Sequence, residues 1–384
     1  MRRLRNSVLK AALVMAPLSL FAQAPQIKLK PADAILGEEF TAIGSVRELS
    51  DGRVLLNDSR DKRVVVADFK AGTVTQVGRV GSGPNEYGTA GPLHRLAGDT
   101  TALFDNATRR WLLFSGASIV ATLAADAPII AAMKGLPRGA DARGNVWQVA
   151  SPALAGLVAN KAQSGTLNTG PGDSDIVIRV NRATLQFDTL AKIRMAPTRM
   201  TIRASADGKV TGMNLIRPPM AVGEESIMFP DGWFAIARLD PYRVDWINPD
   251  GKLVKGAPIP VPLVKMTDAE KDAFFDRADA GKPASAQKPT EAVRAERRAD
   301  LPQFIPPYQA PALLAANDGS VILHRYESKD SPNARYDVVN RKSQLIGVLS
   351  LGAKERIIGF GAKSVYVAWK DDDDIERLRR NPWP

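Results

Sequence analysis

The chain contains no cysteine and only two histidines, His94 and His324. The absence of cysteine excludes a disulfide framework, thiolate zinc sites, a cysteine nucleophile and a lipidated N-terminal cysteine. Two histidines are too few for a metal site built from several imidazoles, and their spacing gives no support to a two-histidine site completed by carboxylates. A protein of 384 residues without disulfides must rely on its hydrophobic core, which a chain of this length can supply.

Two common catalytic patterns are also missing. No Gly-x-Ser-x-Gly elbow occurs, so a serine hydrolase of that type is not indicated. The glycine-rich stretch Gly78–Gly83 is followed by neither Gly-Lys-Ser/Thr nor a helix signal, so it does not match a phosphate-binding loop. We interpret it as a connection between repeats that needs unusual backbone angles, with Glu86 and Tyr87 holding the loop in place.

The first residues have the composition of a secretory signal peptide. A segment with four Lys or Arg side chains among residues 1–10 precedes the mostly apolar Ala11–Phe21, and Ala22-Gln23-Ala24 has the small-residue pattern of a cleavage site. The eleven residues of Ala11–Phe21 are too few to span a bilayer core of about 30 Å. We therefore predict a signal peptide over residues 1–24 and export of residues 25–384 to the periplasm or the cell exterior, with no membrane-spanning segment after cleavage.

The net charge is +11, or +7 without the four basic side chains of the predicted signal peptide. The positive charges are dispersed, and a modest positive field favours acidic partners. No basic stripe interleaved with aromatic residues occurs, so the sequence does not predict nucleic-acid binding.

Glycines that precede apolar or β-branched runs recur at intervals of 46, 46, 88, 87 and 42 residues. Insertions explain the two long intervals better than hidden repeats. The first long interval holds Ala159–Ser174, a loop-like stretch rich in Gly, Ser, Asn and Thr, and a hairpin signal at Asp207-Gly208. We count six units, two of them with insertions, and seven or eight units remain open. The recurring glycines are Gly52, Gly98, Gly144, Gly232, Gly319 and Gly361.

The second long interval has helical character. Thr267-Asp268-Ala269-Glu270 is a capping-box pattern, which predicts a helix that begins after Thr267. Thr290–Asp300, rich in Ala, Arg and Glu, predicts a second short helix. We expect residues 266–303 to form a helical insert between units four and five.

The repeated unit is clearest at Asp51–Val77, which reads as three short β-rich runs separated by polar turns. In several units an aspartate ends one strand and an arginine starts the next, so we expect short-range ion pairs across these turns. The pairs are Asp58 with Arg63, Asp105 with Arg110, Asp240 with Arg243 and, more loosely, Asp374 with Arg377.

Four-stranded units of about 45 residues repeated around an axis are the blades of a β-propeller. Two packed β-sandwiches would also be all-β, but they do not explain a shared period with the same order of turns. We predict an all-β protein, a six-bladed β-propeller with a short helical insertion between blades four and five.

Part of the chain resembles bacterial exported six-bladed propellers of the NHL-like and TolB-like type. Gly81-Ser82-Gly83-Pro84-Asn85-Glu86-Tyr87 is similar to the Gly-x-Gly-Pro-x-Glu-[Phe/Tyr] signature found between their blades, and Pro230–Gly251 and Gly359–Leu378 also resemble that group. The resemblance covers most of the predicted mature chain, although repeat signals are faint in blade three. It implies that an N-terminal strand around Phe40–Leu49 completes the last blade and so removes its open edge.

Two functions remain open at this point. The first is a binding or protein-interaction scaffold whose ligand is unknown, either a protein, a small molecule or a glycan, with six tryptophans available as stacking surfaces for sugars. The predicted contact residues lie near the Asp/Arg turns, on the rim of the propeller, although each is also compatible with a structural role. They are Arg60, Arg109, Trp111, Arg238, Tyr242 and Tyr326.

The second function is an enzyme that uses the central channel, either a metal-dependent hydrolase of the lactonase-like type or a lyase. The sequence identifies no catalytic residue and no metal ligand, and we predict no cofactor, while calcium or zinc in the channel stays open. Asp371–Asp374 offers clustered carboxylates, but it lacks the glycine-spaced loop typical of a calcium site.

Overall fold

The computed structural model describes residues 24–123, 137–152, 164–280 and 290–384, apart from 171, 182, 209 and 332. Residues 1–23, which hold nearly all of the predicted signal peptide, lie outside the described residues. Within the described ranges the regular structure is almost entirely β-strand, with two helices, α3 (Asp268–Ala280) and α4 (Glu291–Ala299). Neither helix is long and apolar enough to cross a membrane.

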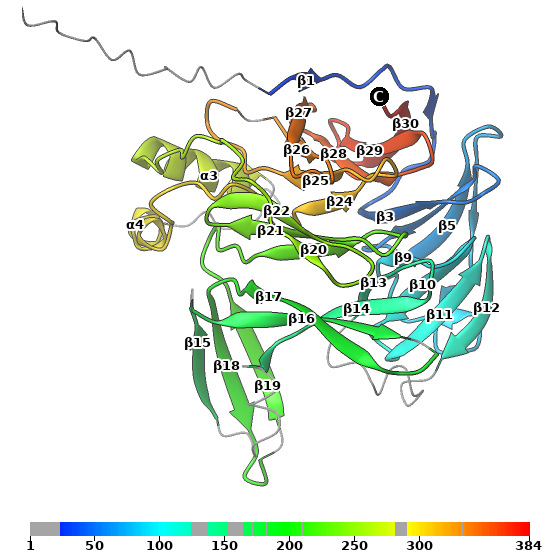
Figure 1. Ribbon diagram of the computed structural model, residues 1–384, viewed down its shortest axis with the longest axis horizontal. Helices are drawn as coiled ribbons and strands as arrows, with labels where there is room; N and C mark the ends of the chain where they lie inside the picture. The colour runs from blue at the N-terminus through cyan, green and yellow to red at the C-terminus, as the bar shows by residue number, and fades with distance from the viewer. Residues whose placement is uncertain are drawn as a thin grey trace, which may run out of the picture.

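Six sheets of the described chain share one plan, in which antiparallel strands pair with their neighbours in chain order. The first three, which run from blue to green in Figure 1, end before residue 195. They are β3 (Ile43–Glu48), β4 (Val54–Asp58), β5 (Arg63–Asp68) and β6 (Thr73–Gln76); β9 (Leu93–Arg95), β10 (Thr100–Asp105), β11 (Arg110–Ser115) and β12 (Ser118–Leu123); and β13 (Pro137–Ala140), β14 (Asn145–Ala150), β16 (Ser174–Asn181) and β17 (Phe187–Arg194).

The other three sheets follow in the second half of the chain, and short N-terminal strands extend two of them. β1 (Gln26–Ile27) runs parallel to β27, and β2 (Ala34–Ile35) runs antiparallel to β30. The sheets are β20 (Glu225–Met228), β21 (Phe234–Leu239), β22 (Tyr242–Ile247) and β23 (Leu253–Val254); β24 (Leu313–Ala315), β25 (Val321–His324), β26 (Arg335–Val339) and β27 (Leu345–Ser350); and β28 (Glu355–Phe360), β29 (Ser364–Lys370) and β30 (Glu376–Pro382).

The first strand of each sheet lies beside the first strand of the next sheet. β3 contacts β9, β9 contacts β13, β13 contacts β20, β20 contacts β24 and β24 contacts β28. β28 in turn contacts β3, so these inner strands form a closed ring. An all-β fold built from four-stranded antiparallel sheets arranged in this way is consistent with a β-propeller.

The recurring glycines occupy the same place in each sheet, in the turn between its first and second strands. Gly52 and Gly232 adopt φ values of 83° and 87°, in the left-handed region that glycine enters without steric cost. The period seen in the sequence therefore reflects one hairpin that recurs once in each sheet. The strands predicted within Asp51–Val77 are confirmed as β4, β5 and β6.

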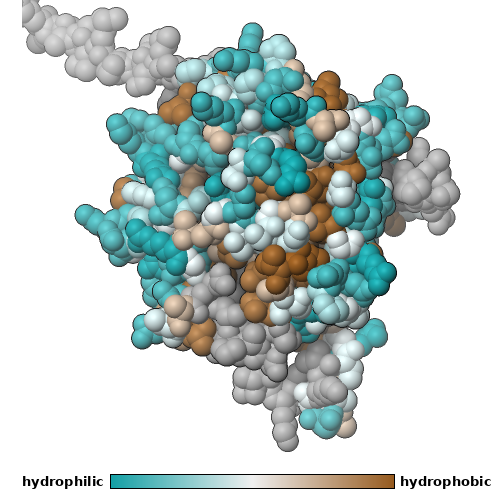
Figure 2. Space-filling view, turned by 90° about the vertical axis from the view of Figure 1, so that its right-hand side faces the viewer, coloured by the Kyte–Doolittle hydropathy of each residue, from teal (hydrophilic) through white to brown (hydrophobic). Residues whose placement is uncertain are grey.

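The hydrophobic core lies between neighbouring sheets. Leu55 on β4 packs with Leu103 and Phe114 of the next sheet, whereas Leu56 packs with Tyr366 of the last sheet. Successive strand residues point to opposite faces, and central strands such as β4 and β5 are buried on both faces, so they read as continuous apolar runs. The face at the right of Figure 1 is mainly hydrophilic, with a smaller hydrophobic area at its centre (Figure 2).

The N-terminal chain completes the last sheet, but with other residues than the sequence predicts. β2 pairs with β30, and Phe40 forms a bridge with Glu376. Most of the predicted closing strand, Phe40–Leu49, instead belongs to β3, the inner strand of the first sheet. The reason is that Leu36 and Phe40 are buried between the first and last sheets, which fixes the closing contact before β3 begins.

Two small sheets lie outside the repeating plan. β15 (Gly165–Thr169), β18 (Thr198–Ala204) and β19 (Val210–Ile216) form a three-stranded sheet that projects beside β16 and β17 in Figure 1. The prediction that Ala159–Ser174 is a loop is therefore wrong where β15 forms, because pairing with β18 overrides a composition that is weak in strand formers. β7 (Arg79–Val80) and β8 (Glu86–Tyr87) form a two-stranded parallel sheet.

The glycine-rich loop has the structural role predicted for it. Glu86 Oε2 accepts a hydrogen bond of 2.7 Å from the backbone N–H of Gly83, and Glu86 Oε1 accepts one of 2.7 Å from Nε of Arg79. Tyr87 is fully buried, and its hydroxyl accepts a hydrogen bond of 2.9 Å from the N–H of Val64. Glu86 therefore holds the two ends of the loop together, and Tyr87 holds the loop against the first sheet.

Both predicted helices form. The hydroxyl of Thr290 caps α4 by accepting a hydrogen bond from the N–H of Val293, and the hydroxyl of Thr267 accepts one from the N–H of Glu270 in α3. The capping box on α3 is only half made, because the carboxylate of Glu270 accepts the N–H of Lys329 at 2.9 Å.

The ion pairs expected across the Asp/Arg turns are largely wrong. Asp105 and Arg110 lie opposite each other with a long 4.0 Å contact, whereas Arg63 pairs with Glu38 at 3.1 Å. The carboxylate of Asp58 is instead occupied by backbone N–H groups, among them that of Thr41 at 2.7 Å. In the other two turns the arginine pairs with a different carboxylate, Arg243 with Asp245 and Arg377 with Asp371 and Glu39.

Candidate functional site

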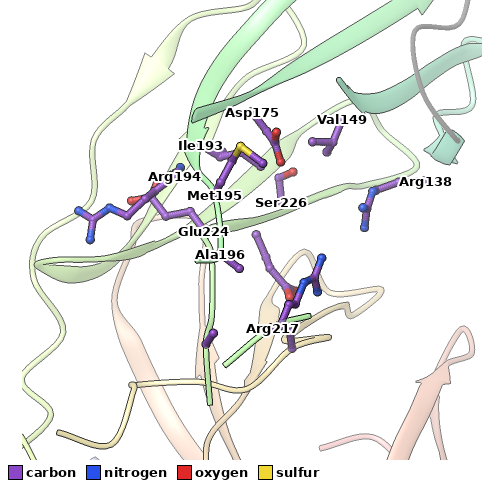
Figure 3. Close-up of a pocket in the computed structure, with 14 residues that line it drawn as sticks. Arg138, Val149, Asp175, Ile193, Arg194, Met195, Ala196, Arg217, Glu224 and Ser226 are labelled. Atoms are coloured by element: carbon purple, nitrogen blue, oxygen red, sulfur yellow. Dashed lines mark hydrogen bonds between the residues drawn. The ribbon is translucent and has the colours of Figure 1, made fainter. Parts of the chain in front are cut away.

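A polar cavity of about 140 Å³ opens where the inner strands β13 and β20 begin. For comparison, a cavity of roughly 150 Å³ holds a molecule the size of benzene. Charged side chains reach it from several elements (Figure 3). They include Arg138 on β13, Asp175 on β16, Arg217 and Glu224 between β19 and β20, and Glu225 on β20, next to Ser226.

Two polar atoms at this cavity have no hydrogen-bond partner in the described structure. They are Oδ1 of Asp175 and the hydroxyl oxygen of Ser226, and both are shielded from solvent. The carboxyl group of Asp175 also interacts with the hydroxyl of Ser151. Leaving a buried polar atom without a hydrogen-bond partner costs about 1–3 kcal/mol of stability. A bound molecule with polar groups that pair with these two atoms would recover that free energy.

The carboxyl groups of Asp175 and Glu225 share one electrostatic environment. Burial raises the pKa of both, and the guanidinium groups of Arg138 and Arg217 oppose that shift in both cases. Oε2 of Glu225 also accepts a hydrogen bond of 2.7 Å from the N–H of Ala312. Arg138 and Arg217 line the cavity, are exposed, and form no ion pair with another described residue.

The wall of the cavity is held by a fixed ion-pair network. Glu224 Oε2 accepts Nη1 of Arg238 at 2.7 Å and the N–H of Arg194 at 3.0 Å. Nε of Arg238 donates to Asp245 at 2.8 Å, and the hydroxyl of Tyr308 donates to the carbonyl of Gly223 at 3.0 Å. These contacts fix the backbone that carries Glu225 and Ser226.

Two of the predicted contact residues lie close to this cavity. Arg238 takes part in the wall network described above. Tyr326 packs against the cluster that includes Met220, which immediately precedes the lining residue Ala221; burial, and then the carboxylate of Glu225, raise the pKa of its phenol to about 12.

The other four predicted contact residues lie away from it. Trp111 is buried against Phe104, and Tyr242 is buried and donates a hydrogen bond of 2.8 Å to Asp337. Arg60 and Arg109 are exposed in the turns β4–β5 and β10–β11. The six residues are therefore not gathered into one site, and their part in binding stays a prediction.

Sequence reasoning missed Arg138, Asp175, Glu225 and Ser226. One signal was available, because Arg138 and Ser226 each lie six residues before a recurring glycine and so occupy equivalent places on two inner strands. Polar residues at that place are at odds with the apolar runs that follow them. Asp175 had no such signal, because it reaches the cavity from the third strand of its sheet.

The described residues contain no group of three or more His, Cys, Asp or Glu side chains that could hold a metal ion. Both histidines are packed against aromatic rings, His94 against Trp111 and His324 in a stack on Tyr336 with 4.6 Å between ring centroids. Burial lowers the pKa of each imidazole to about 4. Asp371 accepts the N–H of Ile375 and pairs with Arg377, as expected for a turn.

Comparison with known proteins gives matches to solved structures alone. No family model matches the chain, and no curated protein matches its sequence. The chain is similar to virginiamycin B lyase from Staphylococcus aureus, with 11% identity, 92% of this chain and 99% of that chain covered, and a TM-score of 0.41. It is also similar to an exported protein from Bacteroides fragilis, with 10% identity and a TM-score of 0.39, and the match covers 93% of this chain and 94% of that chain. A third similar structure is the calcium-binding protein regucalcin from Agrobacterium tumefaciens, with 9% identity and a TM-score of 0.35, and the match covers 94% of this chain and 97% of that chain. At these identities and scores, function has to be argued from the chain's own residues.

Proposed function

We propose that the chain is an exported six-bladed β-propeller, of the NHL-like or TolB-like kind, that binds a small polar molecule. The closed ring of inner strands β3, β9, β13, β20, β24 and β28 supports the count of six. On this proposal residues 1–24 are a signal peptide, and residues 25–384 form one propeller in which residues 266–303 are a helical insert. The rim residues Arg60 and Arg109 remain proposed contacts for a protein partner.

The observation that carries the binding function is the pair of unpartnered buried oxygens at a charged cavity. Asp175 Oδ1 and the hydroxyl of Ser226 offer hydrogen-bonding capacity that no described residue satisfies. Arg138 and Arg217 bring two positive charges to the same opening. A site with fixed walls and unsatisfied polar atoms loses little entropy on binding, because its groups are already in place.

The chemistry of these groups favours a small zwitterion. A carboxylate on the ligand would meet the guanidinium groups of Arg138 and Arg217, which bind planar carboxylates well. An ammonium group would donate hydrogen bonds to Asp175 and Ser226. The cavity of about 140 Å³ fits a molecule with few heavy atoms, so α-amino acids with small side chains are the first class to test.

Thermal unfolding of the purified chain tests this proposal. L-Alanine is expected to raise the melting temperature, because a ligand that binds only the folded state stabilises it. Propionate lacks the ammonium group and ethylamine lacks the carboxylate, so each should give a smaller shift at equal ionic strength. No shift with glycine, L-alanine or L-serine would overturn the proposed ligand class.

Variants test whether the L-alanine shift in melting temperature arises at this cavity. Arg138→Ala and Asp175→Asn should lose most of the L-alanine shift, and Arg143→Ala should keep it. Arg143 is an exposed arginine in the turn after β13, so it serves as a matched control for charge. An L-alanine shift that survives in both Arg138→Ala and Asp175→Asn would exclude this cavity as the site.

A second candidate function is a lyase that uses the same cavity. The observation that favours it is the raised pKa of both Asp175 and Glu225, since carboxyl groups shifted by burial are suited to general acid and base roles. Proton NMR of the ligand during incubation separates the two functions. Unchanged ligand signals support a binding protein, and ligand loss that disappears in Asp175→Asn supports the enzyme.

A further inference from the structure

A second cavity lies at the other end of the inner strands, where β3 and β9 end. Its volume is about 310 Å³, and the turns that follow β24 and β28 close its sides. Arg47 and Arg95, near the ends of β3 and β9, are the basic side chains that line it. It shares no lining residue with the cavity at Asp175 and Ser226.

Arg47 carries a buried charge that no carboxylate neutralises by direct contact. Only 7% of the residue is exposed, yet no ion pair joins it to another part of the described chain. Its two terminal nitrogens donate to the backbone carbonyls of Glu48 and Gly98. Its Nε is buried without a hydrogen-bond partner. Burying a charge without a counter-charge in contact is costly. An anion in the adjoining cavity would therefore stabilise the guanidinium group of Arg47.

Arg95 adds a second positive charge to the same cavity. It is exposed, and its one hydrogen bond within the described structure is a long contact of 3.5 Å to Oδ1 of Asn317. Burial, and then the charge of Arg95, lower the pKa of Arg47 to about 10, although the carboxylates of Asp99 and Glu48 oppose this shift. Two guanidinium groups that repel each other gain from an anion placed between them.

The two acidic side chains at this cavity are already occupied. Glu48 accepts the N–H of Ala362 at 2.8 Å and the hydroxyl of Tyr366 at 2.5 Å. Both oxygens of Asp99 accept hydrogen bonds from Ser50, one from its N–H at 2.8 Å and one from its hydroxyl at 2.5 Å. These acids hold the turns together and form no ion pair with Arg47 or Arg95.

We propose that the cavity beside Arg47 and Arg95 binds a small oxyanion, either a carboxylate or inorganic phosphate. Arginine presents a rigid fork of N–H donors that matches both anions. In this site the anion accepts hydrogen bonds from Arg95 and from the free Nε of Arg47. This second site does not depend on the site proposed for a zwitterion.

Anion titration followed by thermal unfolding tests the proposal. Sodium phosphate and sodium acetate are added in separate series to the purified chain, with sodium chloride keeping the ionic strength constant. The melting temperature should rise with phosphate, with acetate or with both, and the two series identify which oxyanion fits. An equal response in sodium chloride alone would overturn the proposal.

Two variants test whether the anion response arises at the cavity beside Arg47 and Arg95. Arg95→Ala removes an exposed side chain, so the fold should persist while the affinity for the anion falls by about tenfold or more, as expected for loss of a charge-assisted hydrogen bond. Arg47→Met removes the buried charge at similar volume, so the anion-free protein should melt at the same or a higher temperature and lose the anion response.

The outcomes separate this site from the first one. Arg143→Ala and Arg138→Ala should keep the full phosphate response. A response that survives in Arg95→Ala with unchanged affinity would contradict the proposal, as would a response lost in Arg143→Ala. Loss of the L-alanine shift in Arg138→Ala with an unchanged phosphate response would confirm that the two sites are independent.

Discussion

The backbone N–H of Ile43 donates a hydrogen bond of 2.7 Å to Oε2 of Glu376, which joins the start of the first sheet to the last sheet. Glu376 is 5% exposed, and Nη2 of Arg356 pairs with the same oxygen at 2.8 Å. The backbone N–H of Glu376 also donates to the carbonyl of Phe40 at 2.9 Å. One residue of β30 therefore fixes both the chain that precedes β3 and the start of β3 itself.

We predict that Glu376→Ala destabilises the protein by about 1–3 kcal/mol, because it leaves the buried N–H of Ile43 without an acceptor. Glu376→Gln should lose less, since its amide oxygen still accepts that hydrogen bond. The measurement is the free energy of unfolding in urea. Asp372→Ala removes a fully exposed carboxylate as a control, and equal losses in the Glu376→Ala and Asp372→Ala variants would contradict the role of Glu376.

We predict that Tyr242→Phe costs about 1–3 kcal/mol of stability. The phenol donates a hydrogen bond of 2.8 Å to Oδ2 of Asp337, whose side chain is fully buried, so the variant leaves that oxygen without its donor. Urea unfolding measures the loss. If Tyr242 contacts a partner instead of supporting the fold, the variant will unfold like the wild type and lose binding alone.

The two histidines predict how stability depends on pH. Burial lowers the pKa of His94 and His324 from 6.5 to about 4 in the folded state, so the unfolded chain binds more protons between these values. The free energy of unfolding is therefore not reduced by the histidines above pH 6.5. It falls as the pH decreases toward 4, by up to about 3 kcal/mol for each imidazole.

Urea unfolding at a series of pH values tests this prediction. The double variant His94→Gln, His324→Gln should lose less stability than the wild type over the same fall in pH. Carboxylates titrate in both proteins, so the difference between the two curves isolates the imidazoles. Parallel curves would show that the histidines do not contribute.

The raised pKa of Asp175 predicts a pH dependence of stability that is opposite in sign to that of the histidines. Burial raises its folded-state pKa, so the folded protein binds the proton more tightly, and stability falls as the pH rises through that pKa. Asp175→Asn removes the buried charge and should melt at a higher temperature than the wild type near neutral pH. The gain should shrink as the pH falls through that raised pKa, because the wild-type carboxyl then becomes protonated. A variant that melts lower at every pH would contradict a strained, ligand-ready Asp175.

The sequence predicted the fold better than it predicted the site. The recurring glycines could be read because each needs the same hairpin geometry, and the Val and Leu runs around them are typical of strands buried on both faces. The ion pair of Asp58 with Arg63 was wrong because nearby backbone N–H groups compete for the same carboxylate. Local spacing does not reveal that competition.

The candidate site depends on distances that the sequence does not contain. Arg138, Asp175 and Glu225 come from three different strands, and they meet because β13 lies beside β20. The burial of Asp175 and of Arg47 follows from the packing of neighbouring sheets. A charged residue in a β-rich run looks the same in the sequence whether it faces solvent or a cavity.

The most direct test of the central claim is isothermal titration of the purified chain with L-alanine. The account predicts saturable binding, a loss of affinity of about tenfold or more in Arg138→Ala, and unchanged affinity in Arg143→Ala. Affinity that is equal in Arg138→Ala and the wild type, or that is lost in Arg143→Ala, would contradict the claim that the cavity at Asp175 and Ser226 is the binding site.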